Sequence, residues 1–133
     1  MKKALIIMDL QNDFLPGGAL AIPNGDQVLP IVNKLLDRPF DVKVASKDWH
    51  PANHGSFAAT HHMKTGEHTL LDNIDQILWP VHCVQGTPGA EFSKLLHLQK
   101  IEKVFYKGTE TISIATVPFS IMSIKNLPDY MTT

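Results

Sequence analysis

The chain has 133 residues, of which 44% are hydrophobic and 19% are charged, so it has room for one globular domain but not comfortably for two. Its 12 basic and 13 acidic residues give a formal net charge of −1. That balance argues against a general nucleic-acid binder and against a protein that binds anionic membranes.

The amino terminus begins as a signal peptide would, but Asp9 interrupts its apolar run early. A secretory leader needs an apolar stretch of about 7–15 residues, and a membrane-spanning helix needs about 20. Neither is found in the sequence. Cys83 is the only cysteine, so no internal disulfide can form, and we expect a cytoplasmic protein.

The first predicted element is a strand over the apolar run ALIIMD, residues 4–9. A short continuous apolar run predicts a strand buried on both faces, as in parallel sheets. Proline, glycine and asparagine then predict a loop over residues 15–26.

A helix is predicted from Asp26, which is suited to cap it, to the residue before Pro39. Pro30 falls within the first turns, where proline is best tolerated. Apolar residues recur at helical spacing, and those expected to face the core are Val28, Ile31, Val32, Leu35 and Leu36.

The rest of the chain predicts three more strands and a second helix. Alternation over residues 40–48 predicts a strand that ends in Asp48. Residues 49–90 predict one short strand, at 68–72, and otherwise a long loop of the kind that is usually functional in a small domain. Residues 88–100 predict a helix, with Phe92, Leu95 and Leu96 inward, and residues 102–108 a strand that ends at Lys107.

The order strand, helix, strand, helix, strand predicts an α/β domain with a parallel sheet. Ligands in such domains gather at the carboxyl ends of the strands. Asp9, Asp48 and Lys107 each close a predicted strand, so we expect these three side chains to converge on one site.

A metal site is predicted just after the second strand. Asp48 and His50 are two residues apart on an extended segment and therefore point to the same side. A carboxylate with imidazoles suits zinc, iron or manganese, and three protein ligands leave a position for water or substrate. From the spacing, either His54 or His82 could be the third ligand.

Two further polar residues have a functional and a structural interpretation. Asp9, at the end of a buried strand, would be desolvated and so become a usable proton acceptor, or it simply caps a turn. Lys107 would hold a neighbouring carboxylate ionised, or its head group reaches the surface.

Cys83 follows His82 directly, which suggests a nucleophile next to a base. Neighbouring residues on an extended segment point to opposite sides, however, so a His82 that faces the metal turns Cys83 away. Phe14 and Trp79 could be the aromatic walls of a site for a flat ligand, or ordinary core residues.

Four segments in unbroken order resemble the nicotinamidase (pyrazinamidase) family of the isochorismatase-like superfamily: MDLQNDFLPGGAL, ASKDWHPANHGSFA, WPVHCVQGTPGAEF and VFYKGT. The resemblance extends from Met1 to about Thr109. It implies a three-layer α/β/α fold, incomplete at the carboxyl terminus, and hydrolysis of nicotinamide to nicotinate and ammonia in NAD salvage.

The resemblance also implies a role for each candidate residue. Asp9 would be the general base and Lys107 its cationic partner. The implied metal ligands are Asp48, His50 and His82, with His54 close by or coordinating as in some members. Phe14 and Trp79 match the positions that sandwich the ring.

The sequence departs from the family pattern at the nucleophile. The family's reactive cysteine lies on a later strand-to-helix turn that also supplies the oxyanion hole, and this sequence has no counterpart of it. Cys83 matches the family's non-catalytic cysteine beside the metal histidine. We therefore expect this chain to be inactive or severely impaired.

Residues 110–133 form an aberrant tail of what we interpret as a single, partial domain over residues 1–133. With suitable codons, residues 112–125 read one base out of phase spell IDSYSAFFDN, which the family has directly after K-G-T. We interpret the chain as truncated or frameshifted after about residue 109. Sequencing the gene across codons 105–133 tests this interpretation.

Two functions remain open from the sequence. The first is a nicotinamidase-type amidohydrolase that binds nicotinamide and pyrazinamide through a divalent metal, with no nucleic-acid or membrane partner. The alternative is a catalytically dead metal-binding fragment or pseudogene product. The sequence leaves homo-oligomerisation open.

Overall fold

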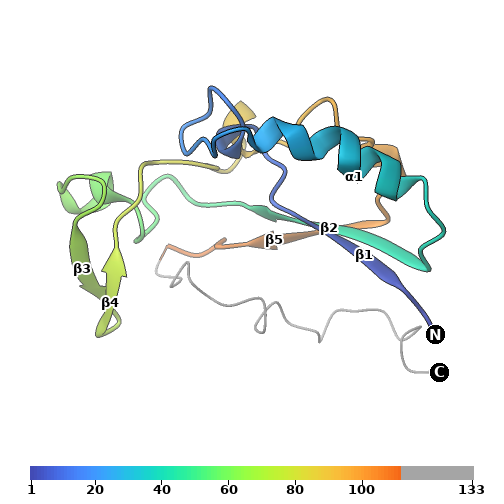
Figure 1. Cartoon of the computed structure of the whole chain (residues 1–133). Coiled ribbons are helices and arrows are strands. Elements are labelled where there is room, and N and C mark those ends of the chain that lie inside the picture. Colours follow the sequence, from blue (N-terminus) through green and yellow to red (C-terminus); the bar gives the residue numbers. More distant parts are fainter. Residues whose placement is uncertain (112–133) are drawn as a thin grey trace.

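The computed structural model describes residues 1–111; the tail beyond them, including most of the segment interpreted as frameshifted, lies outside the described residues. The elements run along the chain as β1 (Ala4–Met8), α1 (Val28–Leu36), β2 (Val42–Asp48), β3 (His68–Leu71), β4 (Ile74–Ile77) and β5 (Lys103–Lys107). Figure 1 shows α1 lying across one face of the sheet formed by β1, β2 and β5. In the described residues, no helix is long and apolar enough to cross a membrane.

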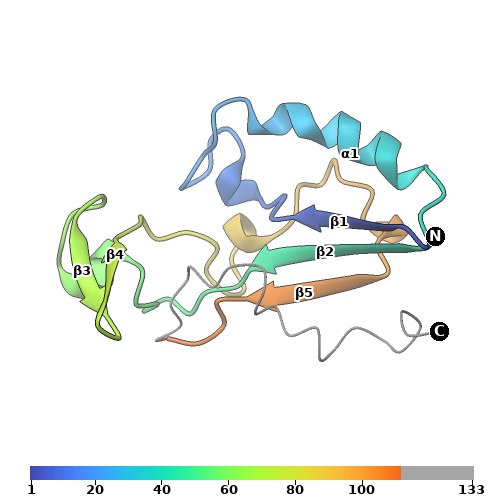
Figure 2. The same cartoon turned by 60° about the horizontal axis from the view of Figure 1, so that its bottom comes forward.

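The main sheet has the order β1-β2-β5, and both pairings are parallel. Met8 lies beside Ser46, and Asp48 lies beside Lys107. All three strands therefore end at the same edge, toward the β3–β4 hairpin (Figure 2). The predicted α/β class with a parallel sheet is confirmed, and the three strands lie where the sequence predicts them.

The core lies between α1 and the sheet. Leu29 and Leu36 of α1 are buried against Ile7 of β1 and Ala45 of β2, with Val32 packed beside them. The prediction that Val28, Ile31 and Leu35 face the core is wrong, because all three are exposed. The helix carries two overlapping apolar stripes, and only packing against the sheet decides between them.

The start of α1 also differs from the prediction. A short 3₁₀ helix, Gly25–Gln27, precedes α1, so Gln27 occupies the cap position and Asp26 lies one residue earlier, within the 3₁₀ helix.

Strand β1 is buried on one face rather than on both. Ile7 is 3% exposed beneath α1, whereas Ile6 and Met8, which point to the other face, are 45% and 54% exposed. The prediction of burial on both faces is therefore wrong for the described residues. Side chains alternate across a strand, and the described helix covers one face only.

The predicted helix over residues 88–100 is also wrong. The segment has two short 3₁₀ helices, Pro88–Ala90 and Leu98–Lys100, joined by irregular backbone. Hydrogen bonds to distant parts of the same chain hold this segment: Ser93 N–H donates to the Leu10 carbonyl, and the Asn33 side chain donates to the Leu95 carbonyl. These tertiary bonds override a helical apolar pattern.

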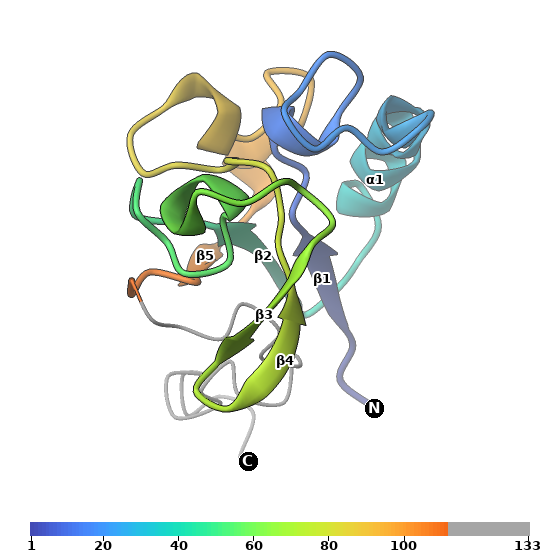
Figure 3. The ribbon, with the colours of Figure 1, turned by 90° about the vertical axis from the view of Figure 1, so that its left-hand side faces the viewer.

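The β3–β4 hairpin forms a sheet of its own, which lies in front of the main sheet in the view of Figure 3. Strand β3 matches the short predicted strand, and β4 pairs with it antiparallel. Asp72 and Asn73 connect them, both with positive φ, at 50° and 62°. A two-residue turn with both residues left-handed is the preferred hairpin connection, and asparagine and aspartate tolerate it best.

Candidate active site and metal centre

The three strand-end residues converge as expected. The Lys107 ammonium lies 3.0 Å from Asp9 Oδ2 and in direct contact with Asp48 Oδ1. These residues end β1, β2 and β5, so the parallel register alone brings them together. One ammonium therefore contacts two carboxylates at the carboxyl edge of the sheet.

Asp9 is held where its strand ends. Its backbone is left-handed, with φ of 54°, and its N–H donates to the Ser46 carbonyl at 3.0 Å. The Ser46 hydroxyl donates to Asp9 Oδ1, also at 3.0 Å. Burial raises the pKa of Asp9, and the opposing attraction by Lys107 does not cancel it. The carboxylate therefore has the raised proton affinity that a general base requires.

Asp48 and Lys107 have the opposite electrostatic character. Burial opposes ionisation of Asp48, but its contacts with His50 and Lys107 outweigh this and lower the pKa of Asp48 to about 2. Burial also opposes the charge of Lys107, yet the two carboxylates raise the pKa of this ammonium. Both groups are therefore charged across the physiological range.

His50 and His82 face the second oxygen of Asp48. His50 Nε2 lies 3.5 Å and His82 Nε2 4.0 Å from Asp48 Oδ2. One nitrogen or oxygen from each of the three residues lies within 4.8 Å of the others, and all three residues are buried. In tetrahedral zinc, bonds of about 2.0–2.1 Å separate the ligand atoms by about 3.4 Å, so this group is close to the required size.

The protonation of the two imidazoles also suits a cation. His50 Nδ1 lies 2.9 Å from the Gly108 carbonyl, and His82 Nδ1 lies 2.7 Å from the Pro80 carbonyl. Carbonyl partners require each Nδ1 to carry a proton, so each ring turns its Nε2, the nitrogen that can bind a metal, toward Asp48. Three electron-rich atoms thus converge, an arrangement that a divalent ion would stabilise.

His54 lies behind this group without belonging to it. Its ring centroid is 4.3 Å from that of His50, and its Nδ1 is 2.7 Å from the Ser56 hydroxyl. Burial, with repulsion from His50 and His82, lowers the pKa of His54 to about 4, so the ring is neutral. Its buried Nε2 has no hydrogen-bond partner among the described residues.

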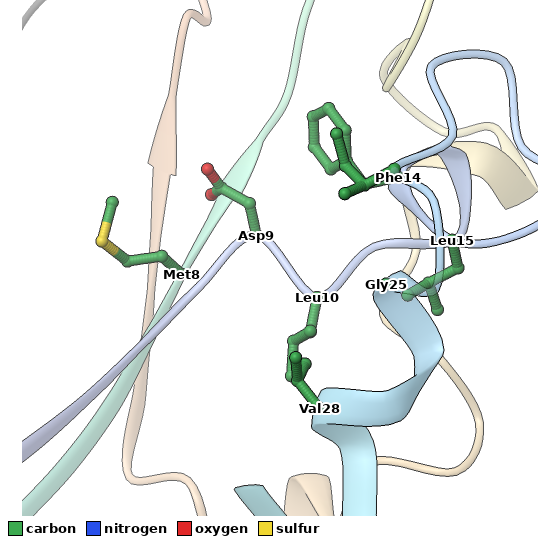
Figure 4. Close-up of a pocket in the computed structure, with 8 residues that line it drawn as sticks. Met8, Asp9, Leu10, Phe14, Leu15, Gly25 and Val28 are labelled. Atoms are coloured by element: carbon green, nitrogen blue, oxygen red, sulfur yellow. The ribbon is translucent and has the colours of Figure 1, made fainter.

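Asp9 faces a pocket with an aromatic wall. Asp9 and Phe14 line a cavity of about 330 Å³ at the ends of β1 and α1. Figure 4 shows the carboxylate and the Phe14 ring on the same side of the chain, while Leu10 points the other way, toward Val28. Trp79, expected opposite Phe14, is 40% exposed and does not line this cavity, so its ring-binding role stays a prediction.

Cys83 lies next to the group Asp48, His50 and His82, called the metal group below, but its thiol is inaccessible and unreactive. Its side chain is fully buried, and its backbone is left-handed, with φ of 47°. Burial, together with the negative charges of Asp48 and Asp13, raises the pKa of this thiol far above its usual range. A nucleophilic cysteine needs the opposite, a lowered pKa and access to the substrate.

The isochorismatase domain family matches residues 3–116 of this sequence. The chain belongs to the isochorismatase family. It is 48% identical over 109 residues to the nicotinamidase of Escherichia coli strain K12, which covers 80% of this chain and 51% of that protein. This isochorismatase-family chain thus spans about half the length of the curated relatives that it matches.

Two solved structures share the fold. A nicotinamidase and pyrazinamidase of Acinetobacter baumanii superposes with a TM-score of 0.77 at 42% identity, covering 81% of this chain and 52% of that one. The pyrazinamidase of Pyrococcus horikoshii in complex with zinc superposes with a TM-score of 0.63 at 38% identity, covering 85% and 55%. The isochorismatase-like α/β fold is therefore established.

Two residues of this isochorismatase-family site were missed in the sequence. Gln11, fully buried, donates to the Asp48 and Ala90 carbonyls and accepts from the Asp48 N–H, so it fixes the backbone of a candidate ligand. Phe57, also fully buried, packs its ring 5.3–5.6 Å from those of His50, His54 and His82. The polar Gln11, two residues after the predicted strand over residues 4–9, was an available signal; nothing local distinguishes Phe57.

Proposed function

We propose that this chain carries the metal-, base- and ring-binding groups of a nicotinamidase-type amidohydrolase that acts in NAD salvage in the cytoplasm. Its ligands would be nicotinamide and pyrazinamide. The observation that supports this most directly is the convergence of Asp9 and Lys107 with the group Asp48, His50 and His82 at one sheet edge.

The metal would be zinc, iron or manganese, held by Asp48, His50 and His82, with His54 close by. The chemistry of the donor set supports this, since one carboxylate and two Nδ1-protonated imidazoles offer three inward ligand atoms. The zinc complex of the Pyrococcus relative is a further argument for zinc. When bound, the ion would supply a Lewis-acid anchor for the nitrogen of a pyridine or pyrazine ring.

The remaining groups would orient the ligand and manage a proton. Phe14 would pack against the flat ring that the ion holds, and Trp79 would close its other side. Asp9 would accept the proton of an attacking group, because burial gives this carboxylate a raised pKa. Lys107, bonded to Asp9 and Asp48, would keep the Asp9 side chain aimed at the pocket.

A second candidate function is a metal- and ligand-binding chain that does not hydrolyse the amide. Cys83 favours it, because the only thiol in the sequence is fully buried and has a raised pKa. Loss of a catalytic nucleophile costs factors of about 10⁶ in rate. On its own, the chain would therefore bind ligand with negligible turnover.

An ammonia-release assay with nicotinamide on the purified, metal-loaded chain separates these two candidates. Calorimetric titration with nicotinamide in parallel measures binding. We expect binding that requires metal, with no ammonia above the protein-free rate. Rapid turnover abolished by Asp9→Ala but retained by Cys83→Ala would show that another group of this chain acts as nucleophile. Absence of both metal and ligand binding would refute the proposed site.

A further inference from the structure

Asp13 joins two segments that are far apart in sequence. Its Oδ2 accepts a hydrogen bond of 2.7 Å from the Cys83 N–H, and its Oδ1 accepts one of 3.2 Å from the Ala19 N–H. Its own carbonyl accepts from the Leu20 N–H at 2.9 Å. The side chain therefore fastens the backbone of Cys83 to the turn that follows β1.

Glycine shapes the niche in which Asp13 lies. A Cβ atom added at Gly89 would fall 2.2 Å from Asp13 Oδ2 and so collide with the carboxylate. One added at Gly18 would fall 2.4 Å from the Asp13 carbonyl oxygen. Gly89 thus makes room for the carboxylate that reaches Cys83, and Gly18 makes room for the backbone carbonyl of the same residue.

The backbone that Asp13 holds is strained. Cys83 has φ of 47°, in the left-handed region that a residue with a Cβ adopts only when its surroundings enforce it. Asp13 accepts from the N–H of this same residue. Without that bond, the backbone would tend to relax toward an ordinary conformation.

Cys83 is also the backbone link between two candidate metal ligands. His82 precedes Cys83 directly, and the Cys83 carbonyl accepts a hydrogen bond of 2.9 Å from the His50 N–H. A change of φ at Cys83 would tilt both the His82 peptide and the carbonyl that holds His50. The metal group would then lose the spacing of its Nε2 atoms from Asp48 Oδ2.

We infer that Asp13 is a positioning residue of the metal centre: it holds Cys83 in its left-handed conformation and so fixes His82 and His50 around the ion. This inference rests on the proposed metal site. Asp13 itself touches neither ion nor ligand in this role. Its effect passes through one backbone conformation, which makes it separable from a general effect on stability.

Glycine at position 83 provides the test, because glycine adopts positive φ without strain. The measurement is the zinc dissociation constant of the full chain, by competition with a chromophoric chelator, with thermal unfolding of the metal-free protein alongside. Asp13→Ala should weaken zinc binding about tenfold or more, as loss of an outer-shell partner does. The same substitution in a Cys83→Gly background should cost almost nothing.

Cys83→Ala is the matched control, since it removes the thiol but keeps a Cβ atom and hence the strain. In that background Asp13→Ala should cost as much as in the natural sequence. Asp13→Asn retains an oxygen for the Cys83 N–H, so it should weaken zinc binding far less than Asp13→Ala and so separate the hydrogen bond from the charge.

An equal loss of zinc affinity in the glycine and alanine backgrounds would overturn the inference, as would unchanged affinity in Asp13→Ala. If Asp13→Ala alone does not fold, the double variant with Cys83→Gly is compared with Cys83→Gly itself. Equal affinities there support the inference, and a tenfold loss overturns it. If the natural sequence binds no zinc, iron or manganese, the proposed function has failed instead.

Discussion

The two halves of the strand-end site differ in how their side chains are held. In the metal half, every candidate ligand is held from behind: Asp48 by Gln11, His50 by the Gly108 carbonyl, and His82 by the Pro80 carbonyl. In the half proposed for hydrolysis, the candidate base Asp9 contacts Lys107, and Cys83, the only cysteine of the sequence, is buried beside Asp48, His50 and His82.

Under the proposed function, ligand binding and bond cleavage would be carried by separable parts of one site. The metal half depends on loops after β2 and β4 and on hydrogen bonds to backbone carbonyls. The hydrolytic half depends on the register of three strands and on one shared cation. Substitutions in one half should therefore leave a measurable property of the other half intact.

The largest expected effect is loss of the metal from His50→Ala. This variant removes a ligand atom, so its loss of zinc affinity should exceed the roughly 100-fold upper range seen for outer-shell partners. Elemental analysis of the purified chain measures the bound ion. His68→Ala, at an exposed histidine of the hairpin, is the control and should retain full metal content. Equal metal content in both variants would place the ion elsewhere.

The next effect is on stability, at the ring that packs behind the histidines. Phe57→Ala should lower the free energy of unfolding by about 3–5 kcal/mol and also weaken zinc binding. Leu36→Ala removes an equally buried side chain of the α1 core and should cost about 2–5 kcal/mol without changing zinc affinity in the folded state. Urea unfolding and chelator competition give the two values. If Leu36→Ala weakened zinc as much as Phe57→Ala, the two regions would not be separable.

A smaller effect is expected at Gln11, which connects the halves. Gln11→Glu keeps the side-chain volume but places a carboxylate oxygen against the Asp48 and Ala90 carbonyls. Buried polar groups left without partners cost about 1–3 kcal/mol, so we expect a loss of about that size in urea unfolding. Asn12→Asp makes the same chemical change at an exposed hydrogen bond to Pro88 and should cost much less. Equal costs would mean that the buried contacts of Gln11 contribute no more than a surface bond.

The smallest effect is a pH dependence in the hydrolytic half. The folded protein raises the pKa of Asp9 by burial, so the ionised carboxylate is disfavoured relative to the unfolded chain. That cost is fully present above the folded pKa and disappears as the pH falls below 3.8, the usual pKa of this carboxyl group. In chelator-treated protein, Asp9→Asn should therefore be more stable than the natural sequence at neutral pH, with the difference shrinking toward pH 4. A difference that grows on acidification would contradict the assignment.

The sequence predicted the parts of the site that depend on strand order. Asp9, Asp48 and Lys107 each end an apolar or alternating run, and parallel register brings such ends together. His50 follows from its spacing to Asp48 on extended backbone. These predictions needed only local patterns and one rule of topology.

The parts that were missed depend on contacts between distant segments. The second helix was predicted from apolar spacing, but Asn33 bonds the Leu95 carbonyl and fixes an irregular path. The choice between His54 and His82 as third ligand depends on which loop returns to Asp48, and spacing carries no such information. The strand β4 had a usable local signal in the turn residues Asp72 and Asn73, which was not used.

The single ammonium of Lys107 has a thermodynamic consequence. It touches both the candidate base Asp9 and the candidate ligand Asp48, so the two carboxylates share one lysine. Capture of a cation by Asp48 and uptake of a proton by Asp9 are then linked equilibria, and each must change the other by the same free energy. Binding of the ion would thereby change the pKa of Asp9, the carboxyl group that faces the pocket, with no movement of the backbone.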